Sequence, residues 1–160
     1  MSRCQAAEAG RQAIIMFRIV SLASMTIGGS IYILWRQDSL TVFAWLKTLG
    51  VFKLVRNVRG VFGGVATALP EWVSLSLPQG LWVFSGCMAV HSIWRCPYRW
   101  QQRLWMFLIL CLSVSGELGQ ATGLVPGVFD LWDLAIVFIA FLVAQLLTAM
   151  DVGPGRCWRV

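Results

Sequence analysis

The chain has 160 residues, of which 58% are hydrophobic and 12% are charged, and its mean hydropathy is +0.73. This composition excludes an ordinary soluble domain, in which about a quarter of the residues are charged. A bilayer core roughly 30 Å thick requires about 20 apolar residues per helix, so the length allows about four spans in a single domain. We therefore expect an all-α integral membrane bundle of four transmembrane helices, with an interfacial amphipathic segment between the first two.

The formal net charge of +6 is the second general feature. In a membrane protein it reflects the bias of Lys and Arg toward the cytoplasmic side and toward anionic lipid, and no nucleic-acid-binding motif accompanies it. Membrane lipid is the expected partner, with another membrane protein as a second candidate and no nucleic acid. The five cysteines form no CxxC pair, so we expect no disulfide framework, no metal site and no cofactor.

The first span is expected over residues 14–35. A cleaved signal peptide is the alternative, but Arg18 interrupts the start of the apolar run, and the run continues past any small-residue cleavage site. A retained membrane anchor fits this pattern better, because Arg18 is near enough to the basic end to reach the interface.

Residues 36–79 mix large apolar side chains with several Lys and Arg residues. Because no stretch of about 20 residues there is free of charge, a full span is not expected. An interfacial amphipathic helix over about residues 40–62 suits the pattern. A re-entrant segment is the alternative, and GVFGGV (residues 60–65) would then form its turn.

The other three spans are expected over residues 78–95, 100–121 and 131–150. Pro78 suits the first turn of the second span, because its missing N–H costs nothing there. Three basic residues lie in the loop at 95–103, two precede the first span and two follow the last, whereas the 116–130 loop has none. The positive-inside rule therefore places both termini in the cytoplasm, in what we expect to be a bacterial inner (plasma) membrane. The cations of the 36–79 segment run against this rule.

An unusual group of polar residues surrounds the turn between the last two spans. Glu117 and Gln120 share a helical face near the end of one span, and Asp130 and Asp133 begin the next. The turn folds these helices into an antiparallel hairpin, and Gln79 begins the second span at the same level. We expect these five residues to form a ligand-binding site at the outer membrane face, although the short loop supplies no basic partner.

Capping offers a simpler explanation of the two aspartates. Asp130 suits a helix N-cap, and an acid at Asp133 suits the positive end of the helix dipole. Capping does not explain Glu117, because a carboxylate near a helix C-terminus opposes the dipole and is costly beside hydrocarbon. Glu71 is expected at the same level, just before the second span.

The order E-x-x-Q, turn, D-x-x-D resembles the VanZ-like family of small bacterial membrane proteins. The matching residues are Glu117, Gln120, Asp130 and Asp133, and the similarity, including LPQGLW and GELGQ…GLVPGVFDLWDL, covers about residues 68–150. The family often carries an Arg shortly before its first Asp, which this chain lacks. The family is linked to glycopeptide-antibiotic resistance and to cell-envelope processes, so the resemblance implies an envelope role.

Two classes of function follow from this pattern. In the first, the polar corner binds a polar head group, a lipid-linked saccharide or a cation, because carboxylates and amides suit sugar hydroxyls and hard cations. The same carboxylates could also serve as an acid–base pair, and no residue selects catalysis over binding. In the second, the chain is a non-catalytic accessory subunit whose polar corner serves helix packing or partner docking. His91 is expected to be structural or interfacial, because no carboxylate or Cys lies at ligand spacing from it.

Overall fold

The computed structural model describes residues 3–36, 41–66, 69–94, 99–125 and 128–151. This part of the chain forms seven helices and no strand, which confirms the all-α prediction. The helices are α1 (Arg3–Trp35), α2 (Thr41–Thr48), α3 (Phe52–Ala66), α4 (Glu71–Leu75), α5 (Leu77–Ile93), α6 (Arg99–Ala121) and α7 (Leu131–Asp151).

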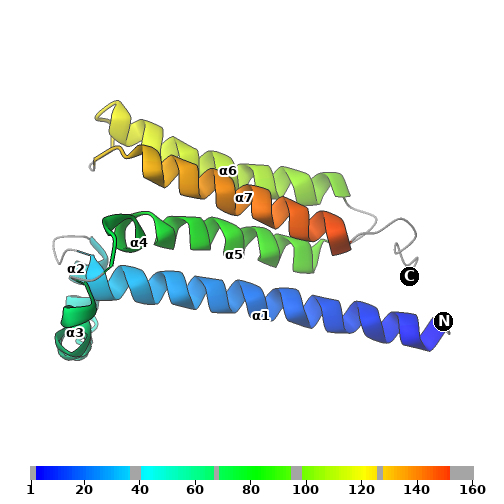
Figure 1. Ribbon diagram of the computed structural model, residues 1–160, viewed down its shortest axis with the longest axis horizontal. Coiled ribbons are helices and arrows are strands. Elements are labelled where there is room, and N and C mark those ends of the chain that lie inside the picture. The colour runs from blue at the N-terminus through cyan, green and yellow to red at the C-terminus, as the bar shows by residue number, and fades with distance from the viewer. Residues whose placement is uncertain (1–2, 37–40, 67–68, 95–98, 126–127, 152–160) are drawn as a thin grey trace.

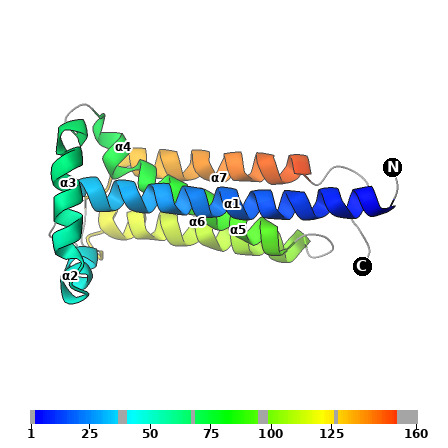
Figure 2. The same ribbon diagram turned by 90° about the horizontal axis from the view of Figure 1, so that it is seen from below.

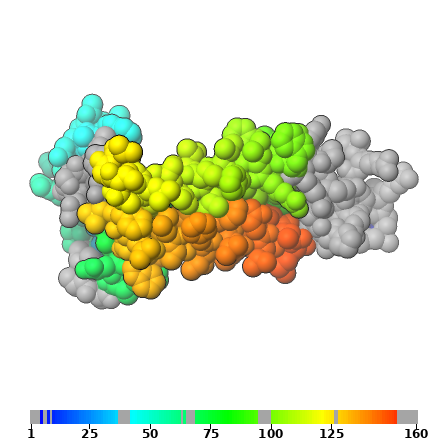
Figure 3. All heavy atoms as spheres, turned by 90° about the horizontal axis from the view of Figure 1, so that it is seen from above, coloured from blue at the N-terminus to red at the C-terminus, as the bar shows by residue number. Residues whose placement is uncertain are grey.

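Four long helices lie side by side along the molecule (Figure 1). Helix α5 is central, with α1 on one side and the α6–α7 pair on the other, and α1 and α7 are its most extensive neighbours. Helices α6 and α7 cover one face together (Figure 3). The buried core accordingly centres on α5, whose Val83, Cys87 and Met88 are at most 2% exposed.

Three of the helices are long and apolar enough to cross a membrane: Gly10–Trp35 of α1, Trp100–Ala121 of α6 and Leu131–Asp151 of α7. They leave large apolar side chains such as Ile19, Leu112 and Leu146 exposed, as helices facing lipid do. These observations indicate a membrane protein. The expected second span corresponds to α5, which has 17 residues and is shorter than the other three. The described residues therefore contain three candidate spans rather than the expected four.

Small residues on α5 allow its neighbours to approach closely, as is common between membrane helices. At Gly80, an added Cβ would lie 2.5 Å from Cγ2 of Ile136 on α7. A Cβ at Gly86 would lie 3.0 Å from Cδ1 of Ile109 on α6. Helix α5 thus presents Gly80 to α7 and Gly86 to α6.

A pair of buried serines joins α5 to α1. Ser21 Oγ lies 2.9 Å from the Ser85 carbonyl oxygen, Ser85 Oγ lies 2.8 Å from the Ser21 carbonyl oxygen, and the two hydroxyls are 3.2 Å apart. In a membrane each such polar group needs a protein partner. The reciprocal arrangement supplies one to both side chains and fixes the register of α1 on α5.

Helices α2 and α3 lie across one end of the bundle, at a large angle to α1 (Figure 2). Gly50 ends α2 with a positive φ of 74°, and Val51 N donates to the Leu46 carbonyl oxygen, which forms a Schellman-type stop. Helix α3 then continues through residues 60–65. The turn that a re-entrant segment required there is not formed, so that alternative is wrong at this point.

Candidate functional site

The site predicted from the sequence lies where α1 and α6 end and where α5 and α7 begin. Helix α6 stops at a Schellman motif: Gly123 has a φ of 72°, and Leu124 N donates to the Gly119 carbonyl oxygen at 2.9 Å. The chain then turns back into α7, which runs antiparallel to α6. We call this end of the bundle, which holds Glu117 and Asp133, the acidic end.

Glu117 is the most deeply buried acid of the site, with 3% of its surface exposed. The Gln79 side chain, from the first turn of α5, acts on this carboxylate as a hydrogen-bonding group. The carboxylate oxygen Oε2 is buried and has no hydrogen-bond partner. The structure therefore brings Gln79 of α5 and Glu117 of α6 together, as the sequence predicted. Glu117 Oε2 is left without a hydrogen-bond donor.

The two aspartates have different roles. The Asp130 carboxylate accepts a hydrogen bond from Trp132 N at 2.9 Å, so Asp130 caps α7 as the simpler explanation predicted. Asp133 is 7% exposed, and its Oδ1 is buried without a partner, which a cap does not explain. Both aspartates act electrostatically on Glu117. Glu117 and Asp133 are thus two nearby buried acids, each with an unused oxygen.

Two other polar residues of the sequence prediction do not belong to this buried pair. Gln120 is half-buried, and none of the described residues forms a hydrogen bond with its side chain. Glu71 is exposed in the first turn of α4. Gln79, Glu117 and Asp133 therefore form the buried part of the site, with Asp130 at its edge.

Arg36 is a site residue that the sequence analysis missed. It directly follows α1, its Nη2 donates to the Leu75 carbonyl oxygen at 2.9 Å, and its guanidinium attracts the Glu117 carboxylate. The α6–α7 loop has no basic residue, and Arg36 is more than 80 positions before it in the sequence. Arg36 directly follows Trp35, the last residue of α1. Its position at this end of the first span was the sequence feature that could have identified it as a site residue.

Unsatisfied polar atoms gather at the acidic end. Within the described residues, seven buried side-chain N or O atoms have no hydrogen-bond partner, and six of them belong to residues near this end. These six are Trp35 Nε1, Arg36 Nε, Ser76 Oγ, Trp82 Nε1, Glu117 Oε2 and Asp133 Oδ1. Native structures pair almost all buried polar groups, so these unpaired donors and acceptors distinguish the acidic end from the rest of the described bundle.

A second polar network lies at the opposite end of the bundle. His91 is fully buried, its Nε2 lies 3.1 Å from Asp151 Oδ2, and its Nδ1 lies 2.8 Å from the Gln102 amide. The ring packs edge-on against Phe17 at 4.5 Å. The network therefore joins α1, α5, α6 and α7. No carboxylate lies near His91 in the sequence, but α5 and α7 run in the same direction and bring His91 and Asp151, near their C-terminal ends, together.

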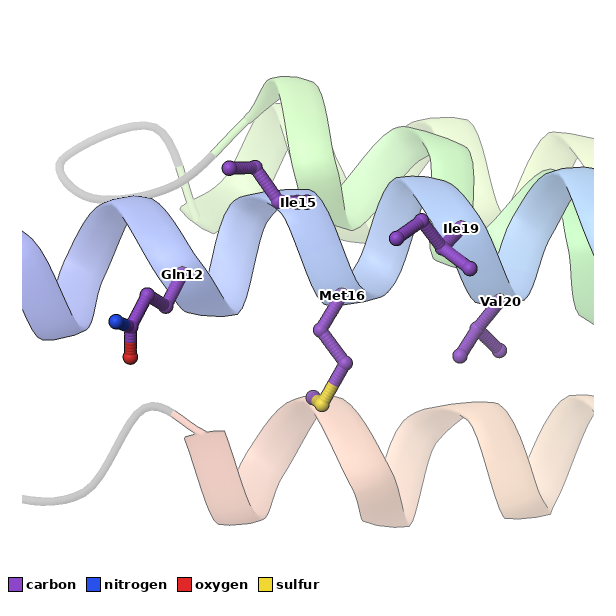
Figure 4. Close-up of a pocket in the computed structure, with 5 residues that line it drawn as sticks. All are labelled: Gln12, Ile15, Met16, Ile19 and Val20. Atoms are coloured by element: carbon purple, nitrogen blue, oxygen red, sulfur yellow. The ribbon is translucent and has the colours of Figure 1, made fainter.

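A surface hollow of about 280 Å³ lies on α1, away from the acidic end. It is lined by Gln12, Ile15, Met16, Ile19 and Val20, and Met16 points toward α7 (Figure 4). Its lining is apolar except for Gln12. Such a surface suits lipid acyl chains and lacks the polar groups that fix a specific ligand.

The described residues contain no group of three or more His, Cys, Asp or Glu side chains placed to hold a metal ion. Comparison with known proteins found no matching family model, no similar curated protein and no similar solved structure. The interpretation of the acidic end therefore depends on its own geometry.

Proposed function

We propose that this chain is a small membrane protein whose acidic end binds a polar lipid head group that carries a positively charged hydrogen-bond donor, such as a primary ammonium. The observation that supports this most directly is the pair of buried, unpartnered carboxylate oxygens on Glu117 and Asp133. An ammonium supplies three donors and one positive charge, which are the features that these two oxygens lack.

The balance of charge favours a cationic ligand over an anionic one. The carboxylates of Asp130 and Asp133 both repel that of Glu117, and Arg36 is the cation that acts on Glu117. Burying a carboxylate without a partner costs several kcal/mol, roughly, even after relaxation. A bound ammonium offsets part of this cost, while the Arg36 guanidinium and the Gln79 amide remain suited to the phosphate or hydroxyl groups of the same head group.

We further propose a membrane arrangement in which α4 and α5 together provide the fourth crossing. A helix of 17 residues is about 25 Å long, and α4 extends it by another turn at the acidic end. The lack of Lys and Arg between α6 and α7 favours an outward-facing acidic end in a bacterial inner membrane. The VanZ-like resemblance and its envelope role agree with this proposal and remain predictions.

Native mass spectrometry of the purified chain with defined lipids tests the proposal. Phosphatidylethanolamine has an ammonium with N–H donors, whereas the choline group of phosphatidylcholine has none, so the two lipids differ at the interaction in question. We expect phosphatidylethanolamine to bind at least tenfold more tightly (on the order of one charge-assisted hydrogen bond). Glu117→Gln and Asp133→Asn should each abolish this preference, and Glu71→Gln, an exposed acid near the same end, is the matched control.

The other outcomes contradict the proposal. Equal binding of the two lipids would show that the ammonium is not recognised, and an unchanged preference in both buried-acid variants would show that phosphatidylethanolamine binds elsewhere. Protection from heat by Mg²⁺ alone would assign the site to a free cation. Stoichiometric co-purification with another membrane protein, without lipid preference, would favour the accessory-subunit function.

A further inference from the structure

The α2–α3 pair has a charge pattern unlike the rest of the molecule. Residues 41–66 contain four cations, Lys47, Lys53, Arg56 and Arg59, and no acid. Both helices lie across the end of the bundle instead of along it (Figure 2). If the long helices cross a bilayer, α3 lies close to the plane of the membrane surface, at the level where α1 ends.

The surface of α3 divides into three stripes. Phe52, Val55 and Arg59 are half-buried, and their spacing of three and four residues marks the face that packs on the molecule. Leu54, Val58 and Val61 form an apolar stripe with exposed fractions of 65%, 38% and 78%.

The third stripe of α3 is polar and carries exposed cations. Lys53 and Arg56 are three residues apart and exposed, and Asn57 follows them. A helix with adjacent cationic and apolar stripes is the pattern of segments that lie in the membrane interface.

Aromatic rings hold several of these cations close to the helix pair. Lys47 Nζ lies 4.9 Å from the centre of the Phe52 ring, and the Arg56 guanidinium lies 5.8 Å from the same ring. The Arg59 guanidinium lies 5.0 Å from the centre of the Phe43 ring. Lys47, Lys53 and Arg56 are nonetheless exposed, so their charges can reach a second surface.

We propose that the α2–α3 pair binds the surface of an anionic lipid leaflet. Lys47, Lys53 and Arg56 contact lipid phosphates, and the stripe of Leu54, Val58 and Val61 enters the upper acyl region. The occupant is lipid because the pair lies across the end of the apolar helices, where the bilayer surface must be, and because its excess of cations complements anionic head groups. This inference depends on α2 and α3 alone and not on the ligand of the acidic end.

The pair also contacts the acidic end. Arg59 donates a hydrogen bond to the carbonyl oxygen of Arg36, and the Arg36 side chain attracts Glu117. Helix α3 therefore holds the backbone of Arg36, the cation that faces the buried acids, whether or not α3 contacts lipid.

Hydrogen–deuterium exchange of the full chain in nanodiscs tests the inference. We compare discs of phosphatidylcholine alone with discs that also contain phosphatidylglycerol, at low and high salt. Amides of residues 50–66 should exchange at least tenfold more slowly in the anionic discs, since each surface cation contributes roughly fivefold to lipid partitioning. High salt should reduce this difference.

The triple variant K47Q/K53Q/R56Q should lose the difference between the two lipids. The matched control R11Q/R18Q/R103Q removes three exposed cations from α1 and α6 and should retain it. Val61→Asp should speed exchange of α3 in both lipids, because it places a charge in the apolar stripe. Equal exchange of residues 50–66 in the two lipids, or a triple variant that behaves like the control, would overturn the proposal.

Discussion

Glu117 is a buried acid whose charge is only partly compensated within the protein. Its side chain is almost fully buried, the Gln79 amide acts on it as a hydrogen-bonding group, and its Oε2 has no hydrogen-bond partner. A buried carboxylate in this state destabilises the fold unless a ligand supplies the missing charge and donors. The spacing of Glu117 and Asp133 around a turn was enough to predict that they approach each other. Arg36 was not predictable in this way, because its proximity depends on the packing of α1 against α5.

Replacement of Glu117 with Gln should stabilise the chain in lipid-free detergent. The neutral amide loses less hydration on burial than a carboxylate, so the free energy of unfolding should rise by about 1–3 kcal/mol. Thermal unfolding followed by circular dichroism measures the change. Glu71→Gln should shift stability by no more than about 0.5 kcal/mol because the side chain is exposed. A less stable Glu117→Gln chain would mean that the charge is already compensated within the protein.

Replacement of His91 should lower stability, whereas replacement of Glu117 should raise it. His91→Leu removes the ring that joins Asp151 and Gln102, so unfolding should become easier by about 1–3 kcal/mol. A double-mutant cycle with Gln102→Leu, measured by the same unfolding assay, should show that the second change costs less once the first is made. Strict additivity of the two changes would contradict a shared network.

At the scale of the helices, small residues decide the packing. The sequence was sufficient to predict helices from long apolar runs, and to place a stop before α7 from its Gly- and Pro-containing turn. Pro126 and Gly127 of that turn lie outside the described residues. The sequence did not indicate that α5 would be the central helix, because hydropathy reports length and polarity but not which neighbours a helix contacts. Gly80, Ser85 and Gly86 make that central position possible, and each contacts a different helix.

Gly80→Ala should therefore destabilise the bundle. The new Cβ would lie 2.5 Å from Ile136 Cγ2 and 3.3 Å from the Ile136 carbonyl oxygen, and the required movement of α7 should cost about 1–3 kcal/mol. Gly29→Ala is the matched control, because nothing lies within 4 Å of its Cβ. Thermal unfolding of the two variants in one detergent compares them. Equal midpoints would show that α5 and α7 do not approach closely.

For the whole molecule, composition alone predicted a helical membrane protein, and the structure agrees on three helices of sufficient length. One of the four expected spans corresponds to α5, which is shorter than the other long helices and is surrounded by them. The two polar networks lie at opposite ends of the same bundle, one fully paired at His91 and one incompletely paired at Glu117. This contrast supports a structural role for the first network and a binding role for the second.

The most direct test of the account is a distance between protein and lipid. Solid-state NMR can measure dipolar coupling between the ¹³C-labelled carboxyl carbon of Glu117 and the ¹⁵N-labelled ammonium of phosphatidylethanolamine in reconstituted membranes. If the ammonium binds at the acidic end, the coupling should correspond to about 4 Å or less, as expected for an ion pair, and should be lost when Asp133→Asn weakens the site. A Glu117 carboxyl carbon with no measurable coupling to the lipid nitrogen would contradict the account.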